Sequence, residues 1–69
     1  MYMKLFVARD KNGFIGLYKI KPTWVRVNQF IEDWGGGFIG FLDKDSFPEV
    51  KFENSPQEVE LKINIRYEN

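Results

Sequence analysis

The dipeptide Asn12-Gly13 is the strongest local fold signal in this sequence, because it lies between two runs in which apolar and polar residues alternate. The first run is YMKLFVAR and the second is FIGLYKIK. A two-residue hairpin loop of type I′ needs a positive φ at both central residues, which Asn and Gly tolerate best. The pattern therefore predicts an antiparallel hairpin over residues 1–21, in which Val7 faces Tyr18.

A second hairpin is predicted over residues 47–67, where the sequence FPEVKFENSPQEVELKI contains two similar phrases, PEVKFE and QEVELK. If NSPQ forms a four-residue loop, Phe52 faces Val59 on the apolar side and Lys51 faces Glu60 on the polar side. The apolar pairs and the opposite-charge pairs then agree in one register, and a shift of one residue destroys both.

The middle of the chain, residues 22–46, is less regular. TWVRVNQF alternates and predicts a strand, whereas residues 29–34 fit either a strand or a single helical turn. The three glycines at 35–37 predict a turn, FIGFL a short strand and DKDS another turn. We expect this middle segment to be the variable and functional region of the chain, and the two hairpins on either side of it to provide the scaffold.

Together these segments predict a single all-β domain over residues 1–69, a compact antiparallel meander of five or six short strands that forms a small barrel or a sandwich. A chain of 69 residues buries only about 60% of its unfolded surface. Its aromatic content of 17% compensates for this small buried fraction, because large rings bury much area per residue. A small sheet also has exposed edges, through which a homodimer could form.

The composition argues against an enzyme, a metal site and a bound cofactor. The chain has neither Cys nor His, so disulfides, thiolate ligands and the usual general base are missing. Ser46 and Ser55 therefore have no His to activate them. Asp43 and Asp45 stand where a calcium loop would begin, but the Gly and Glu that such a loop needs at its sixth and twelfth positions are absent. The glycine run lacks the Lys that follows it in a phosphate-binding loop.

The charge balance gives no general attraction to nucleic acid or to acidic lipid, because ten basic residues match ten acidic ones. The apolar run in MYMKLFVARD is too short for a membrane span. The sequence thus predicts a cytoplasmic protein that does not associate with membranes.

Two groups of side chains are candidates for a binding surface. A protein partner could bind aromatic anchors beside the flexible glycines, although in so small a protein such rings are more often core. Single-stranded nucleic acid could bind basic and aromatic residues on the outer face of the first hairpin, unless Glu58 and Glu60 of an adjacent strand neutralise them. The protein-binding candidates are Phe30, Trp34, Phe38 and Phe41, and the nucleic-acid candidates are Lys4, Phe6, Lys19, Lys21, Trp24 and Arg26.

The segments KLFVARDKNGFIGLYKIKP and FPEVKFENSPQEVELKI resemble a group of small uncharacterised proteins from gut bacteria and their phages. Members are similar in a K-L-[FY]-[IV]-A-R-[DN] strand near the start and in a closing F-P-E-V-x-[FW]-E-N-S-P-x-E-V-E-L-K motif. The resemblance covers about half the chain and implies a phage or mobile-element setting inside a bacterial host cell. It implies no activity and no site residues.

These observations predict a non-enzymatic protein-binding module with an unknown partner. Two alternatives remain open, a small barrel that binds single-stranded nucleic acid and a structural component of a homo-oligomer.

Overall fold

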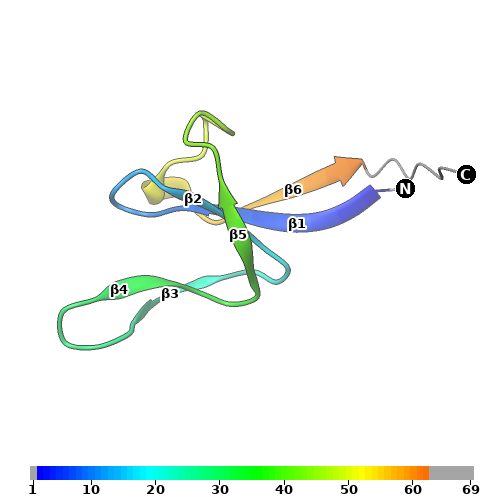
Figure 1. The fold of residues 1–69 in the computed structure, drawn as a ribbon. Helices are drawn as coiled ribbons and strands as arrows, with labels where there is room; N and C mark the ends of the chain where they lie inside the picture. The colour runs from blue at the N-terminus through cyan, green and yellow to red at the C-terminus, as the bar shows by residue number, and fades with distance from the viewer. Residues whose placement is uncertain (1, 63–69) are drawn as a thin grey trace, which may run out of the picture.

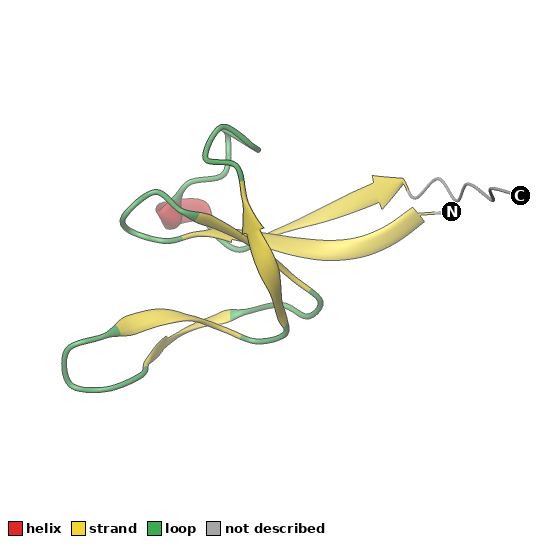
Figure 2. Cartoon of the chain, viewed as in Figure 1, coloured by secondary structure: helices red, strands yellow, loops and turns green. Residues whose placement is uncertain are grey.

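In a computed structural model that describes residues 2–62, the chain forms six strands and one short 3-10 turn, shown in Figures 1 and 2. All pairings between strands are antiparallel, which confirms the predicted all-β class. The strands are β1 (Tyr2–Arg9), β2 (Ile15–Tyr18), β3 (Thr23–Arg26), β4 (Glu32–Gly35), β5 (Phe38–Leu42) and β6 (Gln57–Lys62), and the turn is η1 (Phe52–Asn54).

The strands form two sheets. Four of them lie in the order β5-β2-β1-β6, and β3 pairs with β4 in a separate two-stranded sheet. The larger sheet does not close into a barrel, because β5 and β6 occupy its two edges. The small sheet projects from the larger one as a hairpin arm (Figure 1). Within residues 2–62, no helix has the length and apolar character needed to cross a membrane.

The β1–β2 hairpin forms as predicted, but its register differs by one residue. Val7 faces Leu17 rather than Tyr18, and Tyr18 faces Phe6. Because side chains alternate across a strand, this shift places Val7 and Tyr18 on opposite faces of the sheet.

The cause of the shift is the length of the connecting loop. The Asp10 N–H donates to the Phe14 carbonyl at 2.9 Å and the Gly13 N–H donates to the Asp10 carbonyl at 3.1 Å, so three residues rather than two form the loop. Gly13 has a φ of +97°, and Asn12 has no positive φ. This is the geometry of a type I turn followed by a residue with positive φ, and not of a type I′ turn.

The predicted C-terminal hairpin was wrong. Residues 48–51 form no strand, and β6 pairs with β1, where Leu5 faces Val59 and Lys4 faces Glu60. The alternating apolar and acidic residues of β6 can pair with any strand that places apolar residues opposite the apolar ones and basic residues opposite the acidic ones. The strand β1 also has apolar and basic residues in such positions. The predicted pairs of Phe52 with Val59 and of Lys51 with Glu60 are therefore absent, and residues 63–67 of that arm lie outside the described residues.

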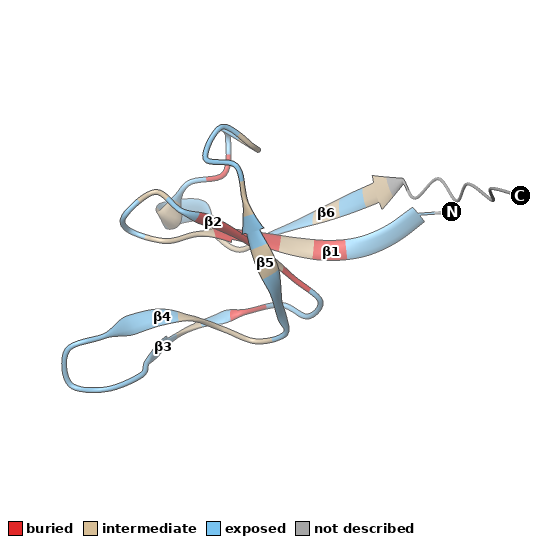
Figure 3. Cartoon of the chain, in the orientation of Figure 1, coloured by how far each residue is buried: buried red, intermediate tan, exposed pale blue. Residues whose placement is uncertain are grey.

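The core lies on the face of the four-stranded sheet that carries Val7 and Ile15, both fully buried. Val50, at 2% exposure, packs against them from the connection between β5 and β6. In Figure 3 most of the buried residues accordingly lie on β1, on β2 and in this connection, and a further buried residue, Pro22, precedes β3. Partly buried side chains surround this centre: Leu17, Leu42, Phe47 and Val59.

The side chain of Arg9, at the end of β1, fixes this connection over the core. Its Nε donates to the Val50 carbonyl at 2.6 Å, and its Nη2 donates to the Ser46 carbonyl at 2.9 Å and to the Phe47 carbonyl at 3.3 Å. Its Nη1 donates to the Gly13 carbonyl at 2.6 Å. One guanidinium thereby ties the loop after β5 to the first hairpin.

The arm formed by β3 and β4 resolves the ambiguity of residues 29–34. The Val27 N–H donates to the Ile31 carbonyl at 2.8 Å, which closes a turn, and the strand begins at Glu32. The predicted turn at the glycines is confirmed: Gly36 and Gly37 connect β4 to β5 with φ values of +135° and +58°.

Candidate protein-binding surface

A bulge in β5 brings two phenylalanines onto one face of the sheet. Phe41 faces Gly16 and Phe38 faces Tyr18, but the register shifts between these pairs, which leaves Ile39 as the extra residue. In a regular strand, residues three apart point to opposite faces, whereas an inserted residue aligns them.

The aligned rings belong to a continuous aromatic surface. The ring centroids of Phe38 and Phe41 are 5.0 Å apart, and those of Phe41 and Phe14 are 5.9 Å apart. The exposed fractions are 44% for Phe14, 51% for Phe38 and 66% for Phe41. We call these three residues the aromatic patch. Sequence reasoning missed Phe14, although its position two residues before Gly16 and four before Tyr18 places it on their face.

A buried tyrosine supports the patch from below. Tyr18 is only 4% exposed, and its ring lies 5.5 Å from that of Phe38, centroid to centroid. Gly16 provides the space, because a Cβ there would lie 3.0 Å from the Tyr18 ring and 3.1 Å from the Phe38 ring.

A shallow hollow of about 320 Å³ adjoins the patch at the end of β5. Phe14, Phe41 and Leu42 form its apolar lining, and Asp43 and Lys44 stand at its side. The Lys44 Nζ lies 5.4 Å from the centroid of the Phe14 ring, within the range of a cation–π contact. An apolar side chain of a partner would fit this lining, with a charge of either sign at the rim.

The outer edge of β5 borders the patch, and no strand among residues 2–62 pairs with it. Residues 34–42 include no charged side chain. The opposite edge, β6, has the sequence QEVELK, in which charges alternate with apolar residues. Charged side chains protect an edge strand from pairing with another chain, so β5 is the less protected of the two edges.

The structure places the other two protein-binding candidates away from the patch. Trp34 is half-buried, its ring lies 5.2 Å from that of Trp24, and its Nε1 donates to the Arg9 carbonyl at 3.0 Å. Phe30 lies at the tip of the β3–β4 arm with 84% of its surface exposed. Of the four predicted residues, only Phe38 and Phe41 are therefore brought together.

The nucleic-acid candidates do not form one surface. Trp24 is covered by Phe52 and by Lys11. The ring centroids of Trp24 and Phe52 are 4.8 Å apart, and the Lys11 Nζ lies 5.5 Å from the centroid of the Trp24 ring. Arg26 forms an ion pair with Glu32 at 3.1 Å. Both lie on the arm rather than on the first hairpin.

The remaining candidates belong to the larger sheet and its connection to β3. Lys4 faces Glu60 and Phe6 faces Glu58, so acidic residues of β6 lie opposite this end of β1. Lys19 and Lys21 are exposed in the connection after β2. Lys4 and Phe6 thus face acidic residues of β6, whereas Lys19 and Lys21 lie outside the strands of this sheet.

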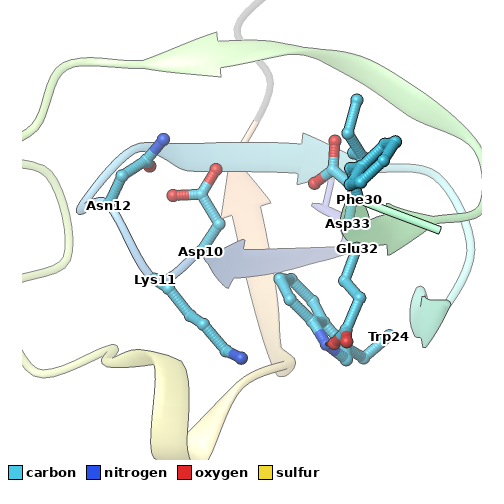
Figure 4. A pocket seen from close by; sticks show the side chains of 8 residues that line it. Asp10, Lys11, Asn12, Trp24, Phe30, Glu32 and Asp33 are labelled. Atoms are coloured by element: carbon cyan, nitrogen blue, oxygen red, sulfur yellow. Dashed lines mark hydrogen bonds between the residues drawn. The ribbon is translucent and has the colours of Figure 1, made fainter. Parts of the chain in front are cut away.

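A larger hollow, of about 450 Å³, lies between the β1–β2 turn and the arm (Figure 4). Its carboxylates already have partners: Asp10 accepts from the Phe14 N–H, Asp33 from the Trp34 N–H, and Glu32 from the Trp24 Nε1. The described part of the chain contains no group of three side chains arranged to hold a metal ion.

Two of these carboxylates affect Tyr18 from a distance. Burial raises the pKa of Tyr18 above 10.0, and the negative charges of Asp33 and then Asp10 raise this pKa further. The hydroxyl therefore stays protonated at neutral pH.

Comparisons of the chain with protein-family models, curated proteins and solved structures found no match.

Proposed function

We propose that this chain is a non-enzymatic protein-binding module and that the aromatic patch is its contact surface. The observation that carries the proposal is the contiguity of three half-exposed phenylalanine rings on a hydrogen-bonded sheet. Exposed apolar patches on small proteins mark interaction sites. Aromatic side chains at such sites contribute much of the energy of binding to a partner protein.

Two further features support a protein partner over nucleic acid. The net charge is zero, and the basic side chains nearest to accessible rings are few, with Lys44 at the patch balanced by Asp43. Binding to a phosphate backbone depends on several cations acting together. The patch has a largely apolar character with a small polar rim, which is the usual anatomy of a protein interface.

The setting we propose follows from the resemblance of both chain ends to small proteins of gut bacteria and their phages. In such a setting the chain would act in the host cytoplasm as an accessory protein of a phage or mobile element. Its task would be to occupy a surface of a host or phage protein.

Affinity capture from a bacterial host lysate tests the proposal with a matched pair of variants. Phe41→Ser removes the most exposed ring of the patch, and Phe30→Ser removes an even more exposed ring at the tip of the arm. We expect the wild type and Phe30→Ser to retain the same protein and Phe41→Ser to lose it, with circular dichroism confirming that all three fold.

Equal capture by Phe41→Ser would contradict the proposal. Capture that disappears after nuclease treatment would instead favour the nucleic-acid alternative, which predicts an affinity for a labelled oligonucleotide that falls steeply with salt.

A further inference from the structure

We infer that the outer edge of β5 pairs in antiparallel fashion with β5 of a second copy of this chain. The inference deepens the proposed function, on which it rests for the role of the aromatic patch, because such pairing would join two patches into one surface. It rests on the contrast between the two edges, on the charges around β5 and on the geometry of the pairing.

The contrast between the edges predicts a closed dimer. β5 is uncharged and its outer edge pairs with no strand of residues 2–62, whereas β6 at the other edge of the same sheet carries alternating charges. A chain with two open apolar edges would form fibres, but the other outer strands among residues 2–62, β3, β4 and β6, all carry charged residues, so pairing through β5 alone ends with two copies. Edge pairing also covers part of the apolar surface that this small chain leaves exposed, including Ile39 at 50% and Phe41 at 66%.

The charges near β5 are compatible with self-pairing. If Gly40 faces its symmetry mate, the paired segment is residues 38–42 of each copy, which carry no charge, and the acidic turn at 43–45 of one copy lies beyond the ladder, beside the glycine turn of the other. Like charges directly opposite each other would destabilise a pair of strands, and this register has none. Gly40 itself has no atom within 4 Å of its Cβ position, so the face of the sheet is open at this residue.

The pairing would place both aromatic patches on the same side. Two antiparallel strands in one continuous sheet are related by a two-fold axis perpendicular to the sheet, which keeps each face on its own side. The dimer would therefore be an eight-stranded sheet, four strands from each copy, in which two groups of phenylalanines lie on a common face near the axis. A partner protein would meet a surface twice as large as that of one copy.

Sedimentation equilibrium over a range of concentrations tests the inference with two nearly identical substitutions. Ile39 in β5 is 50% exposed and Ile31 at the end of the arm's turn is 51% exposed, so Ile39→Lys and Ile31→Lys change the same residue type at equal exposure. We expect the wild type and Ile31→Lys to reach the dimer mass, and Ile39→Lys to dimerise about tenfold more weakly or not at all.

Gly40→Lys serves as a second edge variant if Ile39→Lys does not fold, because its Cβ meets no neighbour. It should also weaken the dimer. A wild type that stays monomeric at all concentrations, a polymer without a defined end point, or a dimer that only Ile31→Lys disrupts would each overturn the inference.

The two proposals can fail separately. A monomeric wild type whose capture of a partner is still lost in Phe41→Ser would reject the dimer and keep the protein-binding function. A dimer that Ile39→Lys disrupts, combined with capture that does not change in Phe41→Ser, would keep the dimer and reject the aromatic patch as the contact surface.

Discussion

Arg9 is the residue on which the long connection between β5 and β6 depends most. Its guanidinium donates to backbone carbonyls of Gly13, Ser46 and Val50, which lie in two separate segments of the chain. The planar fork of arginine provides several donors in fixed directions, and the single ammonium of lysine cannot reach the same carbonyls together.

Arg9→Lys should therefore lower the free energy of unfolding by about 2 kcal/mol or more, since hydrogen bonds to charged groups each contribute roughly 1.5 to 3 kcal/mol. Urea unfolding followed by tryptophan fluorescence measures this difference. Arg26→Lys is the control, because Arg26 is 62% exposed in its ion pair with Glu32 and should change stability by less than about 1 kcal/mol. Equal effects of the two substitutions would show that Arg9 does not fix the loop.

Tyr18 should make stability depend on alkaline pH. Burial, together with Asp33 and Asp10, raises the pKa of Tyr18 in the folded chain above 10.0, so the unfolded chain loses this proton first. The contribution of Tyr18 to the free energy of unfolding is therefore fully present below about pH 10, and it is lost as the pH rises through the pKa of Tyr18 in the folded chain.

Unfolding free energies measured from about pH 9 to about pH 11 should decrease with pH, and Tyr18→Phe should show a shallower decrease over the same interval. The Phe variant is the necessary control because lysines titrate in the same interval. An identical slope in both proteins would contradict the raised pKa.

At the scale of elements, the β1–β2 turn offers a comparison between two glycines that differ in backbone conformation. Neither Gly13 nor Gly40 has an atom within 4 Å of its Cβ position, but only Gly13 has a positive φ, at +97°. Gly13→Ala should destabilise the chain by about 1 to 2 kcal/mol, the cost of placing a Cβ in that conformation.

Gly40→Ala should be nearly neutral or stabilising by about 0.4 to 1 kcal/mol, because alanine restricts the unfolded chain more than glycine does. Thermal unfolding of the two variants beside the wild type measures the difference. If both substitutions cost the same, the turn does not depend on the conformation of Gly13.

The sequence allowed the elements to be predicted better than their partners. The alternation around Asn12-Gly13 indicated the first hairpin, but it could not distinguish a two-residue loop from a three-residue one, since both end in a glycine. In β6 the same alternation fits two different neighbouring strands, and the residues of β1 that pair with it lie fifty or more positions away in the sequence. Local pattern does not contain that information.

The candidate site could also be predicted only in part, because local sequence pattern does not show which residues meet in the fold. Phe38 and Phe41 stood out as aromatic residues beside glycines, yet only the bulge at Ile39 places them on one face, and the pattern of FIGFL does not show a bulge. Trp34 was assigned to the same surface because it is close in sequence, whereas its ring contacts Trp24 and Phe52 on the arm's side.

At the scale of the whole molecule, the distribution of apolar residues separates a scaffold from a surface. The buried core is small, with Val7, Ile15 and Val50 at its centre, and a large share of the aromatic side chains remain accessible. A chain that leaves this much apolar area on an open edge gains stability when a second chain covers it. The proposed pairing through β5 would cover part of this area.

Binding through the edge of β5 and its aromatic patch can be followed directly in amide nuclear magnetic resonance spectra of the wild type, recorded over a dilution series. We expect the amide signals of residues 38–42 to shift with concentration and those at the tip of the arm, residues 28–31, to stay constant. Constant signals throughout β5, or shifts confined to the tip, would contradict this expectation.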